Sequence, residues 1–199
     1  MGVTTWVIVL IKDFDSAKQR LRPALRIKSR RALARRNALL AVRAAAAGDH
    51  VLVVAGGEEV SEVAAAWGAD VLLEPREEGQ NAAAERGLAR AVAQGAEAVL
   101  VLSSDLPLVT HDAVRALLRT AGRFKPPVAV AVPAIGRGGT NALYLRPPLA
   151  IGMHFGDDSL PKFRDDAEAK GVGFVIHHSD AIALDLDEPS DLERLSRAV

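Results

Sequence analysis

The chain has 199 residues, of which 49% are hydrophobic, and this size and composition suit one domain with a substantial core. Its 25 basic and 25 acidic residues balance, so we expect neither nucleic-acid binding nor attachment to a membrane surface. The chain has no cysteine, which excludes disulfides, thiol nucleophiles and cysteine-ligated metals.

The first predicted element is a buried strand at residues 6–11. This run is too short to cross a bilayer and lacks the flanks of a signal peptide, so we expect a cytoplasmic protein. Directly after it, Lys12, Lys18, Arg20 and Arg22 place four cations past the carboxyl end of the strand. Such side chains bind phosphate oxygens, so the segment predicts a polyphosphate-binding loop, with a solvated surface loop as the alternative. The chain has neither a P-loop nor a dinucleotide-binding glycine motif.

The rest of the first half alternates between helical and strand patterns. The predicted helices are 29–47, 58–66, 81–93 and 111–121, the last capped by Thr110, and the predicted strands are 51–55, 71–73 and 99–102. Arginine pairs at 30–31 and 35–36 are interpreted as a solvated helix face. This alternation predicts a mostly parallel, doubly wound α/β sheet.

The strand at 99–102 has no polar alternation, which is typical of a strand buried on both faces. It runs directly into Ser103-Ser104-Asp105, and Pro107 prevents its extension. Ligands of open α/β sheets bind beyond the carboxyl ends of such strands. Asp105 therefore lies where a metal-binding or catalytic carboxylate is expected, although a turn or cap would also favour aspartate.

The second half is less regular. Predicted strands at 128–132 and 142–145 flank a glycine-rich loop at 136–140, which suits either an anion-binding nest or a plain hairpin turn. The remaining predicted elements are a helix at 159–170 with Ser159 as its N-cap, strands at 172–177 and 181–184, and a closing helix that begins at Pro189. No linker or repeat interrupts the chain, so residues 1–199 are expected to form a single domain.

A second carboxylate centre follows the predicted strand at 181–184. Asp185 and Asp187 alternate at strand spacing, so their side chains are expected on the same face. Together with Asp105 they would offer three oxygen ligands, which favour a hard cation such as Mg²⁺. The alternative is that Asp187 caps the final helix and Asp185 is a solvated strand end. None of the five histidines has metal-ligand spacing or a plausible nucleophile beside it, so none is assigned a catalytic role.

Short motifs spread over nearly the whole chain form a recognisable combination. They are Lys12 with Ala17-Lys18-x-Arg20-Leu21, Gly79-x-Asn81-x-Ala83, Ser104-Asp105-Leu106-Pro107-Leu108, Gly138-Gly-Thr-Asn-Ala-Leu143, Phe155-Gly156-x-x-Ser159 and Asp185-Leu-Asp187-x-Pro189-x-Asp191-Leu192. With these motifs the chain resembles the 2-phospho-L-lactate/phosphoenolpyruvate guanylyltransferases, the CofC/FbiD family. That family belongs to a wider nucleotidyltransferase group with the MobA-like molybdenum-cofactor guanylyltransferases.

The resemblance implies a three-layer α/β/α domain with the Rossmann-like architecture of nucleotide-diphospho-sugar transferases. It implies transfer of GMP from GTP to a small phosphorylated acid, with release of pyrophosphate, in coenzyme F-420 biosynthesis. The implied metal ligands for Mg²⁺ are Asp105, Asp185 and Asp187, and the implied catalytic residues are Asp105, Lys18 and Arg20. The implied binding residues are Thr140, Gly156 and Ser159 for the acid, and Lys12, Lys18, Arg20, Asn81 and Ser104 for the nucleotide.

The chain departs from the family pattern at three places. Leu10 replaces a proline, Gln80 replaces a leucine, and Lys162-Phe163 replaces an Arg-His pair. The third departure leaves the identity of the acceptor acid open. Phosphoenolpyruvate is expected because the composition resembles that of bacterial proteins, with 2-phospho-L-lactate and 3-phosphoglycerate as alternatives. Relatives of the family also suggest a homodimer.

In-line transfer needs no general base here, because a phosphate oxygen of the acceptor is already ionised at neutral pH. Positioning and charge neutralisation would then supply the catalysis. One competing hypothesis is another nucleotidyltransferase, although Leu10-Ile11-Lys12-Asp13 stands where many of those have a glycine-rich loop. The other is a non-catalytic nucleotide-binding protein on the same fold.

Overall fold

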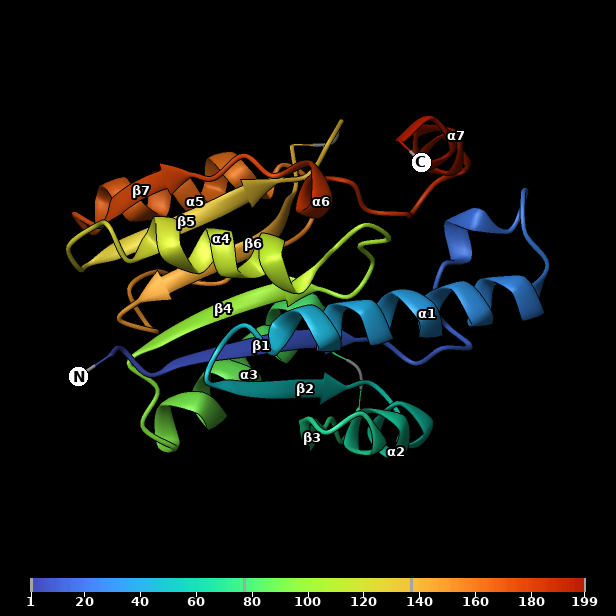
Figure 1. The fold of residues 1–199 in the computed structure, drawn as a ribbon, viewed down its shortest axis with the longest axis horizontal. Coiled ribbons are helices and arrows are strands. Elements are labelled where there is room, and N and C mark those ends of the chain that lie inside the picture. The colour runs from blue at the N-terminus through green and yellow to red at the C-terminus, as the bar shows by residue number, and fades with distance from the viewer. Residues whose placement is uncertain (1, 77, 137, 199) are drawn as a thin grey trace.

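The computed structural model describes residues 2–76, 78–136 and 138–198 and shows a seven-stranded sheet with helices on both faces (Figure 1). The strands are β1 (Thr5–Ile11), β2 (His50–Ala55), β3 (Asp70–Leu73), β4 (Ala98–Ser103), β5 (Val128–Pro133), β6 (Thr140–Arg146) and β7 (Gly173–Ile176). The helices are the 3-10 turn η1 (Gln19–Leu21), α1 (Ile27–Ala45), α2 (Glu58–Ala66), α3 (Gln80–Ala93), α4 (His111–Ala121), α5 (Ser159–Ala169), α6 (Asp180–Ala183) and α7 (Pro189–Ala198).

The strand order is β3-β2-β1-β4-β6-β5-β7, so β1, β4 and β6 are neighbours in the middle of the sheet. Strands β1, β2, β3 and β4 run parallel, whereas β6 is antiparallel to both β4 and β5. Because β6 runs the opposite way, its first residue, Thr140, lies beside the carboxyl end of β4. The predicted class, a mostly parallel α/β sheet, is confirmed.

The central strands are buried on both faces, and each face has its own hydrophobic cluster. On β1, Val7, Val9 and Ile11 pack in the cluster that includes α1, α2 and α4. Trp6, Ile8 and Leu10 point to the opposite face and pack with α3 and α5. This arrangement gives three layers and explains why the strands have continuous apolar runs. None of the described helices is long and apolar enough to span a membrane.

The structure corrects the prediction of a strand at 181–184. These residues form most of the short helix α6, because the N–H groups of Ile182 and Ala183 donate to the carbonyl of Ser179. The side chain of Asn141 on β6 also donates to the Ile182 and Ala183 carbonyls, at 2.9 and 3.0 Å. The backbone of this segment is therefore engaged by a helical turn and a side-chain amide, and Asp185 and Asp187 follow a helix.

Two helix starts also differ by one residue from the prediction. Ser159 is the first residue of α5, and the N-cap is Asp158 in a left-handed conformation with φ of 52°. Helix α3 begins at Gln80, after Gly79 with φ of 96°. In both cases a residue with positive φ sets the start of the helix. Residue 77, between the predicted strand at 71–73 and the predicted helix at 81–93, and residue 137, in the predicted loop at 136–140, are outside the described residues.

Candidate active site

A cleft of about 420 Å³ opens at the edge of the sheet where β1 and β4 end and β6 begins. All of the predicted site residues except Asn81 and Ser159 line it. The sheet topology explains this convergence, because the carboxyl ends of parallel strands and the start of an antiparallel strand meet at one edge. The ends of β1 and β4 and the start of β6, which are distant in the sequence, therefore contribute to one site together with other loops.

Lys18, in the loop after β1, contacts two other segments of the site. Its backbone is left-handed, with φ of 59°, a conformation that non-glycine residues adopt at an energetic cost. Its side chain has no exposed surface, and the ammonium lies 2.6 Å from Oδ1 of Asp105. The same ammonium donates a hydrogen bond to the carbonyl of Leu186. One buried cation thus connects the loop after β1, the end of β4 and the segment after α6.

Arg20 makes the second cationic contact across the cleft. Its Nη1 donates to Oδ2 of Asp187 at 3.0 Å and lies 3.6 Å from Oε1 of Glu188. The backbone N–H of Leu186 donates to the carbonyl of Asp105 at 3.0 Å, so both carboxylate segments are also joined directly. The predicted cationic loop and the predicted carboxylates are therefore in contact.

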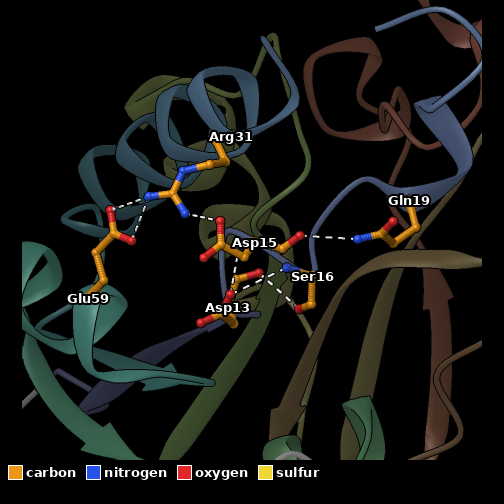
Figure 2. Close-up of polar contacts among 6 residues, drawn as sticks. All are labelled: Asp13, Asp15, Ser16, Gln19, Arg31 and Glu59. Atoms are coloured by element: carbon orange, nitrogen blue, oxygen red, sulfur yellow. Dashed lines mark hydrogen bonds and ion pairs between the residues drawn. The ribbon is translucent and has the colours of Figure 1, made fainter. Parts of the chain in front are cut away.

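The loop that carries these cations is fixed by a polar network (Figure 2). Asp13 accepts hydrogen bonds from the backbone N–H groups of Asp15 and Ser16, at 2.7 and 3.3 Å, which closes a tight turn. Figure 2 shows the Arg31 guanidinium of α1 between Asp15 and Glu59 of α2. Arg31 donates to both oxygens of Glu59, at 2.8 and 3.1 Å. The loop is thus connected to helices α1 and α2.

The underside of the loop contains a polar layer that the sequence did not reveal. Arg30, predicted on a solvated face, is only 5% exposed and donates to the carbonyl of Lys18 at 3.4 Å. Asn37 is fully buried and donates to the carbonyl of Asp105 at 3.4 Å. The two side chains lie on one face of α1 with Ala34, which lines the cleft. Residues of α1 therefore support the backbone of both Lys18 and Asp105.

The other end of the cleft is built mostly from neutral groups, with the carboxylate of Asp157 beside them. Thr140 lines the cleft, and its Oγ1 accepts a hydrogen bond from the fully buried Ser159 hydroxyl at 3.0 Å. Gly156 lines the cleft with φ of 125°, a conformation that favours glycine. Gly138 has φ of 61°, a conformation that favours glycine, and a Cβ there would require the Asp158 carboxylate to move. The predicted acid-binding residues are brought together, with Ser159 behind Thr140.

Asn81 is placed differently from the other predicted residues. Its amide donates to the carbonyl of Phe155 at 3.1 Å and accepts from the N–H of Phe155 at 2.7 Å. It is not among the described residues that line the cleft. Direct contact with the nucleotide remains a prediction, and the observed partner of Asn81 is the backbone next to Gly156.

Asp166 of α5 fixes the start of the same loop. Its Oδ2 accepts from the N–H of Gly152 at 2.7 Å and lies 3.0 Å from Nε2 of His154. Burial alone would raise the pKa of Asp166, but hydrogen bonds from Gly152, His154 and Lys170 outweigh it and lower the pKa to about 2. The loop before Gly156 therefore depends on an ionised carboxylate.

The donor chemistry of the cleft suits a hard cation. Asp105, Asp185 and Asp187 all line it, and carboxylate oxygens are typical magnesium ligands. Among the described residues, no group of three or more His, Asp or Glu gathers closely enough to hold a metal by itself. Mg²⁺ is commonly held by one or two carboxylates together with substrate phosphates and water. The residues therefore fit a cation that binds together with a nucleotide.

Comparison with known proteins assigns this chain to a family. The profile of the family described as "Guanylyl transferase CofC like" matches residues 5–196. The chain belongs to the CofC-like guanylyl transferase family. It is 37% identical to a phosphoenolpyruvate guanylyltransferase from Conexibacter woesei, over 99% of this chain and 89% of that protein. It is 39% identical to the Rubrobacter xylanophilus enzyme of the same name, over 97% of this chain and 94% of that protein.

The fold agrees with this family assignment. A nucleotidyl transferase from Methanothermobacter thermautotrophicus superposes with a TM-score of 0.66 at 17% identity, covering 99% of this chain and 98% of the other. The predictions of the CofC-like family and of a nucleotidyltransferase enzyme are confirmed, and the non-catalytic alternative is not. Arg30, Asn37 and Asn141 support the site but were given no role from the sequence, because only their contacts reveal one.

Proposed function

We propose that this CofC-like protein transfers GMP from GTP to phosphoenolpyruvate. The proposal rests on one observation: a single cleft has paired charged side chains at one end and mostly neutral groups at the other. Paired cations and carboxylates, centred on Lys18 and Asp105, suit a triphosphate, while Thr140 and the exposed glycine loop suit a small acid. The names of the Conexibacter and Rubrobacter relatives support phosphoenolpyruvate as the acceptor.

In the proposed reaction, a phosphate oxygen of the acid attacks the α-phosphorus of GTP. The new O–P bond forms as the bond between the α-phosphorus and the bridging oxygen of the β-phosphate breaks, and pyrophosphate leaves. The nucleophile is already an anion, so no side chain needs to remove a proton. Lys12, Lys18 and Arg20 would neutralise the phosphates, and backbone N–H groups near Thr140 and Gly156 would orient the acid.

In this proposal the carboxylates of Asp105, Asp185 and Asp187 would hold Mg²⁺ together with the GTP phosphates and water, and not by themselves. When bound, the cation supplies charge neutralisation and orientation at the phosphates. Ser104 would contribute to nucleotide binding from the end of β4. A place in coenzyme F-420 biosynthesis, a cytoplasmic location and a homodimer complete the proposal, and light scattering after size exclusion tests the dimer.

The deciding experiment is pyrophosphate release from GTP with Mg²⁺, measured with one acid at a time. Relatives named for 2-phospho-L-lactate and 3-phospho-D-glycerate make these acids the necessary comparisons. We expect the highest kcat/KM with phosphoenolpyruvate, and a higher value with another acid would change the acceptor. No release with any of them would refute the proposed function.

The matched variant is Asp105→Asn, which keeps an oxygen facing Lys18 but removes the carboxylate charge. We expect it to abolish turnover while leaving the circular dichroism spectrum unchanged. Unchanged turnover would refute a metal or catalytic role for Asp105.

A further inference from the structure

The side chain of Asn81 binds the backbone of a single residue 74 positions away in the sequence. Its Nδ2 donates to the Phe155 carbonyl at 3.1 Å, and its Oδ1 accepts from the Phe155 N–H at 2.7 Å. This pair of hydrogen bonds satisfies both backbone groups of Phe155, as a neighbouring strand would. The amide is therefore committed to Phe155 in this structure.

Phe155 is in turn the residue that presents Gly156 to the cleft. Its ring is buried against Phe163, at 5.2 Å between ring centroids, so the side chain is fixed from one side. Gly156 follows with φ of 125° and is exposed in the cleft. The direction of its backbone N–H depends on the peptide that Asn81 holds.

Asn81 also lies between residues at the start of α3 that line the cleft. Gly79 and Gln80 precede it, Ala83 follows it, and all three are lining residues. The same amide thus connects the wall made by α3 with the loop at Gly156 and Asp157. Two hydrogen bonds therefore connect these walls.

We infer that Asn81 is a positioning residue that holds the acceptor loop through Phe155 and couples it to the start of α3. The inference rests on the proposed function, since it assigns Gly156 to the acid and α3 to the nucleotide side. Asn81 would then act on acid affinity without touching the nucleoside. This differs from the contact that the sequence motif predicts for it.

The experiment compares Asn81→Ala with wild type by calorimetric GTP affinity in Mg²⁺ and by the KM for phosphoenolpyruvate. Loss of two partly buried hydrogen bonds should raise the acid KM about tenfold, with the GTP Kd within about twofold. Gln94→Ala, an exposed amide at the other end of α3, is the matched control and should change neither value. A GTP Kd raised tenfold with an unchanged acid KM would overturn the inference in favour of nucleoside contact.

Asn81→Asp keeps the acceptor for the Phe155 N–H and tests the inference if the alanine variant does not fold. It should raise the acid KM and leave the GTP Kd unchanged, and no change in either value overturns the inference. Amide exchange gives a readout that does not require turnover, because the Phe155 N–H should lose protection in Asn81→Ala and keep it in Gln94→Ala. Failure of wild type to use any acid would instead refute the proposed function.

Discussion

The two ends of the cleft are built by different kinds of interaction. At one end, buried and exposed ion pairs connect Lys18 with Asp105 and Arg20 with Asp187. At the other end, neutral hydrogen bonds connect Ser159 with Thr140 and Asn81 with Phe155. Charge pairs provide strong but directionally tolerant attraction, whereas neutral hydrogen bonds fix shape. This difference is consistent with the proposal above, in which the charged end binds a polyanion and the other end selects a small acid.

Lys18→Met should break the charged end and give the largest effect. It removes the cation that contacts Asp105 and Leu186, so we expect kcat/KM to fall by about 10³-fold, as when a preorganised charge-stabilising group is lost. Steady-state pyrophosphate release measures this. Lys125→Met, an exposed lysine just before β5, is the control and should retain activity. A less than tenfold loss for Lys18→Met would contradict the assigned role.

Ser159→Ala should weaken the neutral end alone. The buried hydroxyl donates to Thr140 Oγ1 at 3.0 Å, so its removal frees the Thr140 hydroxyl to rotate. We expect the acid KM to rise by about 5- to 10-fold, the size of one neutral hydrogen bond, with an unchanged GTP Kd. Ser196→Ala, on the exposed face of α7, is the control. A larger change in GTP affinity than in acid KM would remove the distinction between the two ends.

Arg31→Met should weaken the charged end of the cleft slightly and leave the other end unchanged. Arg31 holds the cationic loop through Asp15 and Glu59, and its half-exposed ion pairs are each worth little (Figure 2). We expect the GTP Kd to rise by about two- to fivefold and the acid KM to stay constant. Titration calorimetry at low and high salt measures this, and the effect should shrink at high salt. An effect on the acid KM alone would contradict the assignment.

Asp166→Asn should have the smallest effect on catalysis and a clear dependence on pH. The pKa of Asp166 in the folded state, about 2, lies below the usual unfolded value of about 3.9, so its ionised form stabilises the fold above that value. This contribution is lost as pH falls from about 4 towards 2. Denaturant unfolding should therefore show a gap between wild type and variant at pH 6 that narrows at pH 3. A constant gap would show that ionisation of Asp166 does not contribute.

Local sequence patterns predicted most of the fold. Helix α2 at 58–66, the capping of α4 by Thr110 at 3.1 Å and the start of α7 at Pro189 are as predicted. Each of these depends on neighbouring residues, which a single sequence contains. The short helix α6 was predicted as a strand, because its apolar residues fit both patterns and the amide of Asn141, 41 positions before Ile182, is decisive.

The residues of the site also divide into those that the local sequence predicts and those that depend on contacts distant in the sequence. Lys18, Arg20 and Asp105 could be identified because charged residues follow buried strands, and the sheet brings strand ends together. The burial of Arg30 could not be predicted, since its helix face is defined by the loop packed over it and not by spacing. Asn81 was recognised through its motif, but a motif does not contain the backbone partner 74 residues away.

The ion pair between Lys18 and Asp105 neutralises two charges that line the same cleft. If Asp105 holds a divalent cation and Lys18 a phosphate, as proposed above, the two side chains lose their mutual contact. GTP alone would have to separate an existing ion pair, and so would the cation alone. We therefore expect each to bind weakly by calorimetry and the pair to bind together, so that loading of the site responds to the metal–nucleotide complex and is insensitive to free GTP.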